Sequence, residues 1–381
     1  MGMATAPMTA PVLPNYGEGS LADLASSLLA ALGVKGTPNH LRLPRARRVC
    51  LLVVDGLGWE LLRDHPAAAP FLSELAMAGR PLTAGFPATT VTSLASLGTG
   101  MPPGQHGMLG YQVAVPGRGM LLNGLRWNKE IDPREWQPKP TVYERAAAAG
   151  ATCFRVASAR LQKTGLSAAA MRGNGYRPAD SLGGLAAQAA AALRDVDRGL
   201  VTVYHAELDG TGHAFGCRSD AWRYQLGHVD KLAEQLAGAV PEETDFYVTA
   251  DHGMVDVSPE DRVDADTVPG MRDGVALLGG EGRARHVYTV PGAADDVLTA
   301  WREILGERAW VLARDEAIAA GWFGPVDPGL AERIGDVVAA PAGQAAVVAT
   351  VTEPLESALV GMHGSLTAAD QFVPLLQLTT G

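Results

Sequence analysis

Three long apolar runs that each end in an aspartate constrain the fold of this chain most strongly. They are RRVCLLVVDGLG (47–58), GLVTVYHAELDG (199–210) and DFYVTADHGM (245–254). An unbroken apolar run is typical of a strand that is buried on both faces. Stretches with helical periodicity, such as 181–196, separate these runs. Strands that alternate with helices predict an α/β fold, with a mostly parallel central sheet and helices on both of its faces.

The pattern of strands and helices changes after about residue 256. The stretch GVALLGGEGRARHVYTV is typical of a hairpin rather than of a strand–helix unit, and a helix and two further strands follow it. We therefore expect an inserted α+β cap. The predicted organisation is an N-terminal arm and helix (1–46), an α/β core (47–255), the cap (256–350) and a C-terminal return to the core (351–381).

Composition argues against several kinds of partner. The 381-residue chain has a net charge of −10, and no basic stripe is present to neutralise phosphates, so we expect no nucleic-acid partner. Three widely spaced cysteines form no C-x-x-C pair, which favours a reducing compartment over a disulfide framework. We find no signal-peptide pattern and no apolar run of membrane-spanning length, so we expect a cytoplasmic protein without a membrane partner. The sequence does not indicate an oligomeric state.

Residue types that bind metals gather at the predicted strand ends and in glycine-rich loops. They are Asp55, Asp209, His213, Asp251, His252 and His363. Carboxylate oxygens and imidazole nitrogens are the ligands that zinc and similar divalent ions prefer. Because ligands bind at the carboxyl ends of parallel strands, we expect these side chains to meet there. A single Asp-Gly or His-Gly is more often a turn, so the prediction rests on the joint pattern.

Five motifs, in this order along the chain, resemble the alkaline phosphatase superfamily, specifically its nucleotide pyrophosphatase/phosphodiesterase branch. They are LLVVDGLG, FPATTVTSLASLGTGMPPGQHG, ELDGTGHAFG, TADHGM and GMHGS. The resemblance covers most of the chain, although the arm and the cap are not diagnostic. It implies an enzyme, a metal-dependent phosphoric ester hydrolase with a small-molecule substrate.

The resemblance also implies two divalent metal ions, usually zinc. The implied ligand sets are Asp209, His213 and His363 for one ion, and Asp55, Thr90, Asp251 and His252 for the other. Two such ions, roughly 4 Å apart, clamp the attacking and leaving oxygens of an in-line phosphoryl displacement. In this scheme Thr90 is both a ligand and the nucleophile.

The stretch FPATTVTS (86–93) carries four hydroxyl side chains, of which the resemblance selects one. The family's nucleophile lies in a Pro-x-x-Thr element that is followed nine residues later by Thr-Gly. Pro87 to Thr90 supplies the first element and Thr99-Gly100 the second, so Thr90 aligns as the nucleophile. The local sequence agrees, because VTSLASLG predicts a helix that starts just after Thr90, and a helix N-terminus stabilises an anion and binds phosphate oxygens.

Three positions depart from the pattern of this branch and bear on the substrate. Tyr111 stands where an Asn usually contacts the phosphate, Val91 replaces an aromatic residue after the nucleophile, and Ser93 replaces a nearby Asn. We therefore treat these three residues as candidate substrate-binding positions.

Three functions remain open at this point. The first is a phosphodiesterase or nucleotide pyrophosphatase that forms a phosphothreonine intermediate. The second is a phosphomonoesterase or phosphonate hydrolase on the same metal core. The third is a non-catalytic metal-binding module, which would need no nucleophile.

Overall fold

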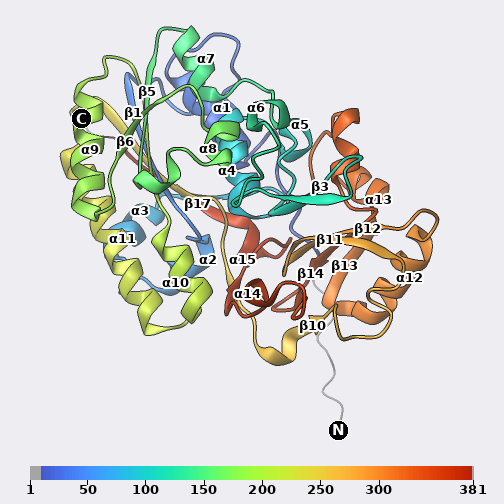
Figure 1. The fold of residues 1–381 in the computed structure, drawn as a ribbon. Helices are drawn as coiled ribbons and strands as arrows, with labels where there is room; N and C mark the ends of the chain where they lie inside the picture. Colours follow the sequence, from blue (N-terminus) through green and yellow to red (C-terminus); the bar gives the residue numbers. More distant parts are fainter. Residues whose placement is uncertain (1–9, 380–381) are drawn as a thin grey trace.

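A computed structural model describes residues 10–379 of the chain, so the first part of the predicted N-terminal arm (1–9) lies outside the described residues. Its centre is a seven-stranded sheet with the order β2-β17-β8-β1-β7-β5-β6 (Figure 1). The strands are β1 (Arg48–Val54), β2 (Arg80–Thr83), β5 (Thr152–Ala157), β6 (Gly175–Pro178), β7 (Gly199–His205), β8 (Thr244–Ala250) and β17 (Phe372–Thr379). The five strands from β8 to β6 run parallel, whereas β17 pairs antiparallel with both of its neighbours.

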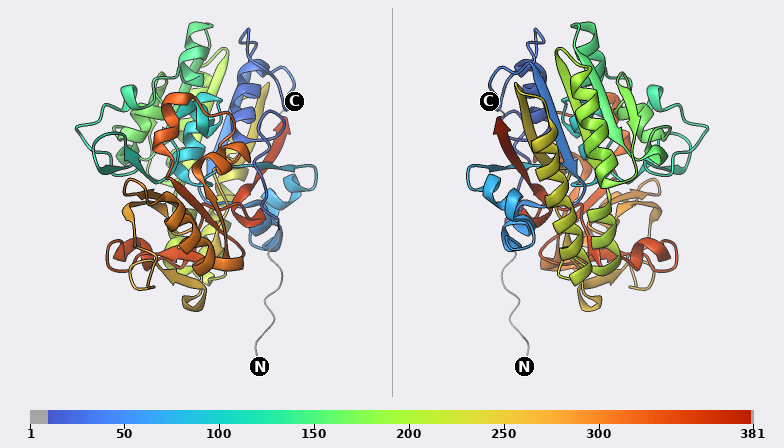
Figure 2. Two further views of the ribbon diagram at one scale, coloured as in Figure 1. Left: turned by 90° about the vertical axis from the view of Figure 1, so that its right-hand side faces the viewer. Right: turned by 90° about the vertical axis from the view of Figure 1, so that its left-hand side faces the viewer.

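Helices cover both faces of this sheet, and the right-hand view of Figure 2 looks onto α9 and α11 on one of them. The helices on that face are α2 (Trp59–Asp64), α3 (Pro70–Ala76), α9 (Leu182–Arg194) and α11 (Asp220–Ala239). Those of the other face are α1 (Leu21–Ala31), α4 (Thr90–Thr99), α7 (Val142–Ala148) and α8 (Gly165–Ala170). With both faces covered, every residue of β7 and β8 is buried, which explains their unbroken apolar runs. The predicted α/β fold is confirmed.

The stretch after Asp55 holds two helices, α2 and α3, with a break between them at Pro66, a residue that cannot donate an intrahelical hydrogen bond. One local prediction needs correction. The run that ends in Asp209 was expected to be strand to its end. Instead β7 stops at His205, and α10 (Glu207–Phe215) carries Asp209 in its first turn.

A second, antiparallel sheet has the order β11-β12-β14-β13 and packs on α12 (Figure 1). The strands of this sheet and the helices next to them in the chain are β11 (Val275–Glu281), β12 (Ala284–Thr289), α12 (Ala294–Leu305), β13 (Ala309–Ala313), α13 (Arg314–Ala319) and β14 (Val337–Pro341). The sheet has a hydrophobic core of its own around Trp301 and Val287. It lies within the segment assigned to the cap, whose exact limits stay a prediction.

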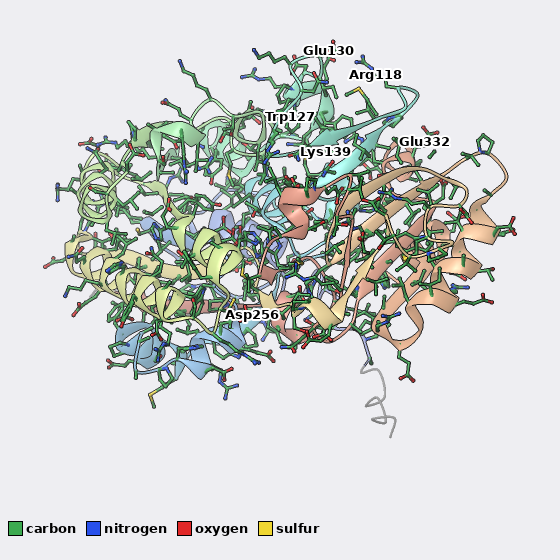
Figure 3. The ribbon with its side chains drawn as sticks, turned by 60° about the horizontal axis from the view of Figure 1, so that its bottom comes forward. Arg118, Trp127, Glu130, Lys139, Asp256 and Glu332 are labelled. Carbon is green, nitrogen blue, oxygen red and sulfur yellow. The ribbon has the colours of Figure 1, made fainter. Side chains whose placement is uncertain are left out.

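Short elements join the two sheets. They are α5 (Pro103–His106), β3 (Gln112–Val115), β4 (Met120–Asn123), α6 (Pro133–Trp136), β9 (Val255–Asp256), β10 (Arg262–Asp264), β15 (Ala346–Val348), α14 (Pro354–Ser357), β16 (Gly361–Met362) and α15 (Ala368–Gln371). Strand β9 pairs with β16, so the chain leaves and re-enters the core at one place, near Asp256 in Figure 3. At another point of contact, Lys139 Nζ lies 2.7 Å from Asp327 Oδ2. Within residues 10–379, none of the helices is both long enough and apolar enough to cross a membrane.

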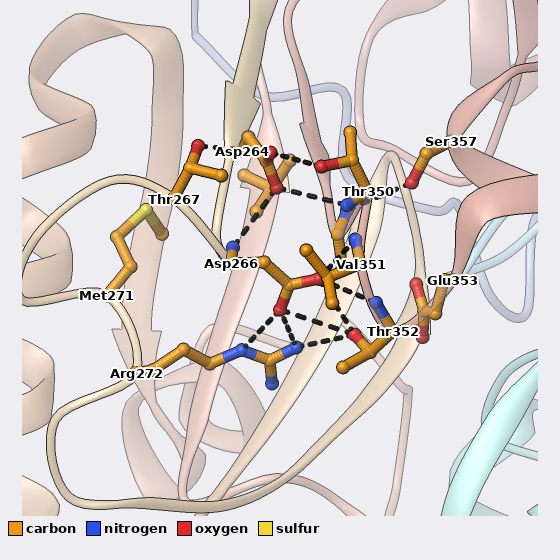
Figure 4. Close-up of polar contacts among 12 residues, drawn as sticks. Asp264, Asp266, Thr267, Met271, Arg272, Thr350, Val351, Thr352, Glu353 and Ser357 are labelled. Carbon is orange, nitrogen blue, oxygen red and sulfur yellow. Dashed lines mark hydrogen bonds and ion pairs between the residues drawn. The ribbon is translucent and has the colours of Figure 1, made fainter.

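A polar clasp holds the segment that precedes α14 (Figure 4). Asp264 accepts hydrogen bonds from the backbone and hydroxyl of Thr350, at 3.1 and 2.5 Å. Asp266 accepts from Thr352 and also pairs with Arg272. Because α14 lines the cavity described below, this clasp helps to fix one of the cavity walls.

Candidate active site

A cavity of about 270 Å³ opens beside the carboxyl ends of the central strands. Its walls come from both sheets and from the segments that join them. They are formed by Thr89, Thr90, Tyr111, Leu125, Arg126, Asp209, His213, Glu281, Gly282, Leu355, Glu356, Leu359, Met362 and His363. Such a position is the one expected for a ligand site in a parallel α/β sheet.

Asp209, His213 and His363 form one candidate metal cluster, because each offers a ligand atom within 4.8 Å of the others. One helical turn of α10 separates Asp209 from His213, whose Nε2 lies 3.2 Å from Asp209 Oδ2. The Nδ1 atoms of His213 and His363 contact the carbonyls of Gly361 and Ala88, at 2.8 and 3.0 Å. These contacts leave both Nε2 atoms facing the cluster.

The charges of this first cluster are strongly coupled. Burial disfavours the charged carboxylate of Asp209, but His213 outweighs burial and holds the pKa of Asp209 below its usual range. Burial likewise disfavours a charged His213, yet Asp209 raises the pKa of His213 to about 9. In the absence of an ion, His213 therefore carries the positive charge that balances Asp209.

Asp55, Asp251 and His252 form the second candidate metal cluster. The last residue of β1, Val54, is in register with Ala250 at the end of β8, so Asp55 and Asp251 emerge side by side. His252 Nε2 lies 3.4 Å from Asp55 Oδ1 and 3.7 Å from Asp251 Oδ2. Its Nδ1 contacts the carbonyl of Gly253 at 3.0 Å, which again leaves Nε2 for the cluster.

The donor sets of both clusters fit divalent cations. Asp55 Oδ1, Asp209 Oδ1 and Asp251 Oδ2 are buried without a hydrogen-bond partner among the described residues. Unpaired buried carboxylate oxygens are costly, and burial raises the pKa values of Asp55 and Asp251 above the usual range. A cation at each cluster supplies the missing partner, and three oxygens with three imidazoles are a suitable ligand set.

Thr90 lies between the second cluster and the cavity. It is the first residue of α4, with Thr89 as the N-cap, and its Oγ1 lies 3.2 Å from His252 Nε2. The rings of His252 and His363 stack with centroids 3.6 Å apart, so the two clusters adjoin each other at the Thr90 side chain. Free N–H groups of the first turn of α4 are available to bind an anion there.

The candidate substrate-binding residues have different environments. Tyr111 lines the cavity, and its hydroxyl donates to Glu356 Oε1 at 3.2 Å. Val91 and Ser93 are buried in α4 and are not among the residues that line the cavity. The structure therefore brings Tyr111 to the site and packs Val91 and Ser93 behind it.

Two residues at the site escaped the sequence analysis. Tyr204 donates a hydrogen bond from its hydroxyl to Asp55 Oδ2. No motif marks Tyr204. A strand places successive side chains on opposite faces, and the neighbouring His205 contacts Gln225 Nε2 at 3.1 Å on the other face. Glu281, from the tip of the β11–β12 hairpin, also lines the cavity. Burial raises the pKa of Glu281 to about 8, and no motif marked it.

A mostly parallel sheet with two carboxylate–imidazole clusters at its carboxyl edge is the arrangement expected of a metal-dependent phosphoric ester hydrolase. Residues 49–366 match the family described as type I phosphodiesterase / nucleotide pyrophosphatase. The chain belongs to this family, as its motifs predicted. No curated protein matches the sequence.

Solved structures show the same fold. Murine ectonucleotide pyrophosphatase / phosphodiesterase 5, solved as an inactive variant in complex with AMP, is 18% identical with a TM-score of 0.68, over 86% of this chain and 87% of that chain. Phosphonoacetate hydrolase from Sinorhizobium meliloti 1021, in complex with phosphonoformate, is 19% identical with a TM-score of 0.67, over 90% and 92%. At these identities the likeness concerns the fold alone.

Proposed function

We propose that this chain hydrolyses phosphodiesters or nucleotide pyrophosphates through a covalent phosphothreonine at Thr90. The observation that carries the proposal is the position of the Thr90 hydroxyl at the N-terminus of α4, 3.2 Å from His252 and beside both clusters. A binding module has no need of a hydroxyl at this place. The family membership supports phosphoric ester hydrolysis as the reaction.

Two divalent ions, which we propose to be zinc, would be held by the two clusters. When bound, such ions polarise the phosphoryl group and favour the deprotonated form of a coordinated hydroxyl or water. The ligands would be Asp209, His213 and His363 for one ion, with Asp55, Thr90, Asp251 and His252 for the other. Tyr204 orients Asp55 through its hydroxyl.

The reaction then proceeds in two displacements. Thr90 Oγ1 attacks phosphorus, the bond from phosphorus to the leaving oxygen breaks, and the leaving group takes up a proton. The N–H groups of the first turn of α4 bind the negative phosphoryl oxygens. Water then attacks the phosphothreonine and restores the Thr90 hydroxyl.

The cavity walls carry groups that select the substrate. Tyr111 and Arg126 flank Glu356 on one wall, at 3.2 and 4.0 Å, and Leu125 and Leu355 contribute apolar surface. The likeness in fold to phosphonoacetate hydrolase supports a second candidate, a phosphonate or phosphomonoester hydrolase on the same ligand set. Tyr111 stands where this branch usually has an Asn that contacts the phosphate, so Tyr111 bears on the choice between the two candidate substrates.

The experiment compares four substrate classes with zinc-loaded protein. We expect bis-p-nitrophenyl phosphate and a nucleotide pyrophosphate to be hydrolysed faster than p-nitrophenyl phosphate and phosphonoacetate. Thr90→Ala is expected to abolish each reaction. Ser73→Ala removes a buried hydroxyl on α3, on the opposite face of the sheet from α4, and should not do so. A clear preference for the monoester or the phosphonate would establish the second candidate, and an active Thr90→Ala variant would contradict the nucleophile.

The three cysteines are consistent with the compartment that the sequence predicts. Cys50, Cys153 and Cys217 are all buried and unpaired. Burial raises the pKa of the Cys153 thiol to about 11, so it is an unreactive residue. We propose on this basis that the protein works in the reducing environment of the cytoplasm.

A further inference from the structure

Glu281 is a carboxylate that the second sheet delivers to the candidate metal site. It ends β11, and its side chain is only 15% exposed. Its Oε2 lies 3.8 Å from Nδ1 of His363, and its Oε1 is buried without a well-formed hydrogen bond among residues 10–379. The nearby Thr89 side chain offsets only part of the effect of burial on the pKa of Glu281. A buried carboxylate oxygen without a partner indicates that something positive is missing beside it.

The hairpin tip that carries Glu281 is anchored firmly. Arg283, two residues further on, forms a bidentate pair with Asp370 at 3.0 and 2.7 Å, and both side chains are fully buried. A Cβ on Gly364, the residue that follows His363, would lie 3.2 Å from Glu281 Oε1. The Glu281 carboxylate therefore packs closely against the loop that carries His363, at a glycine whose φ of 129° already disfavours other residues.

We propose that Glu281 strengthens binding of the cation held by Asp209, His213 and His363, by pairing with the imidazole of His363. The Nδ1 of a metal-binding histidine commonly faces a carboxylate or a carbonyl, and such a partner makes the histidine a stronger ligand. His363 Nδ1 already contacts the Ala88 carbonyl at 3.0 Å, and Glu281 adds a negative charge on the same side. This inference rests on the proposed two-metal function.

The charge balance of the site points in the same direction. Two divalent ions bring four positive charges, and the carboxylates Asp55, Asp209 and Asp251 bring three negative ones while Thr90 keeps its proton. Glu281 supplies a fourth negative charge from outside both ligand sets. The inserted cap thereby takes part in metal binding, because the Glu281 carboxylate reaches the site only when the β11–β12 hairpin packs against the core.

Glu356 provides a matched control. It lines the same cavity but already has partners, since Tyr111 donates to it at 3.2 Å and Arg126 lies 4.0 Å away. A carboxylate that is satisfied in this way has no need of a cation. Glu281→Gln and Glu356→Gln therefore remove the same charge from the same cavity in two different settings.

The experiment is a titration of Zn²⁺ into metal-free protein, in competition with a chelator, combined with thermal melting of the metal-free protein. For Glu281→Gln we expect one of two binding events to weaken by about 10- to 100-fold, and the metal-free variant to melt at or above the wild-type temperature because an unpaired buried carboxylate is gone. For Glu356→Gln we expect zinc affinity within about twofold of wild type. Opposite effects on metal affinity and metal-free stability would not arise from a merely structural role.

Other outcomes overturn the inference in distinguishable ways. If wild type binds two ions and Glu281→Gln binds both equally well, only the role of Glu281 fails. A lower melting temperature of metal-free Glu281→Gln would make Glu281 a structural residue and would likewise overturn it. If the wild-type protein binds no zinc, the metal site itself is absent, and the proposed function fails together with the inference.

Discussion

Thr90 Oγ1 and His252 Nε2 lie 3.2 Å apart, each presented by a different segment of the core. Two ligand atoms on one tetrahedral zinc ion are separated by roughly 3.4 Å, given bonds of about 2.0–2.1 Å. A separation of 3.2 Å suits a hydrogen bond, and it is also close to the spacing of two ligands on the ion that we propose at this cluster. In this proposal the Thr90 hydroxyl lies where a bound cation would favour the loss of its proton.

Replacing Tyr204 by Phe tests the support of the second cluster. Tyr204 donates to Asp55, so its loss should weaken zinc binding about 10- to 100-fold and lower activity correspondingly. Tyr247→Phe is the control, since this buried hydroxyl on β8 has no hydrogen-bond partner among the described residues and its removal should leave zinc affinity unchanged. Zinc titration of both variants decides, and equal affinities would remove Tyr204 from the site.

Metal removal should lower stability. An ion that binds only the folded state stabilises it by about 2.7 kcal/mol when its free concentration is 100 times its dissociation constant. We therefore expect chelator-treated protein to melt lower than zinc-loaded protein. Asp251→Asn removes a candidate ligand of one cluster, so zinc should raise the melting temperature of this variant by less than it raises that of wild type. Melting curves that do not respond to zinc would contradict the fit of the clusters to cations.

Glu281 and His213 should each make a contribution to the stability of the metal-free protein that falls as pH rises. Burial raises the pKa of Glu281 to about 8, so folding favours the neutral form of this side chain. The stability that this form contributes is fully present below pH 4.5, the ordinary pKa of a glutamate, and is lost as pH rises past 8. His213, whose pKa Asp209 raises to about 9, loses its favourable charge between 6.5 and 9, in the same direction. Melting in chelator between pH 5 and 9 measures this slope, and Glu281→Gln should reduce it. A slope identical in both proteins would exclude Glu281 as a cause.

Arg283→Met should be strongly destabilising. It leaves the fully buried Asp370 charge without its bidentate partner, which costs about 3–5 kcal/mol. Lys139→Met removes one member of a partly exposed pair with Asp327 and should cost about 0–1 kcal/mol. Denaturant unfolding of the metal-free variants compares the two. Similar losses would show that the anchor of the hairpin contributes no more than a surface contact.

Much of the fold followed from local patterns, because buried strands and the alternation with helices leave a direct mark on the sequence. The six carboxylate and imidazole candidates stand in short motifs, and the structure brings them together in two groups, while their role as metal ligands stays a prediction. The structure differs at Asp209, which was assigned to a strand end. The spacing of four residues to His213 was the signal for a helix, and the apolar run before it concealed that signal.

Residues that act through tertiary contact were not predictable. Glu281 lies in a hairpin without a motif, and its contact with His363 is made across a tertiary interface that Arg283 and Asp370 also join. The burial of Val91 and Ser93 likewise depends on how α4 packs, which the sequence around the nucleophile does not specify. Such packing decides which side chains contact the substrate. The candidate metal ligands, in contrast, stand in short sequence motifs.

The most direct test of this account is the identification of the phosphorylated residue. Zinc-loaded protein is mixed with bis-p-nitrophenyl phosphate, quenched in acid during turnover and digested, and the peptides are analysed by mass spectrometry. We predict a nitrophenyl-phosphoryl group on Thr90, which is absent from Thr90→Ala. A phosphoryl group on Thr89, Thr92 or Ser93 instead, or a Thr90→Ala variant that turns over the substrate at the wild-type rate, would contradict the central role of Thr90.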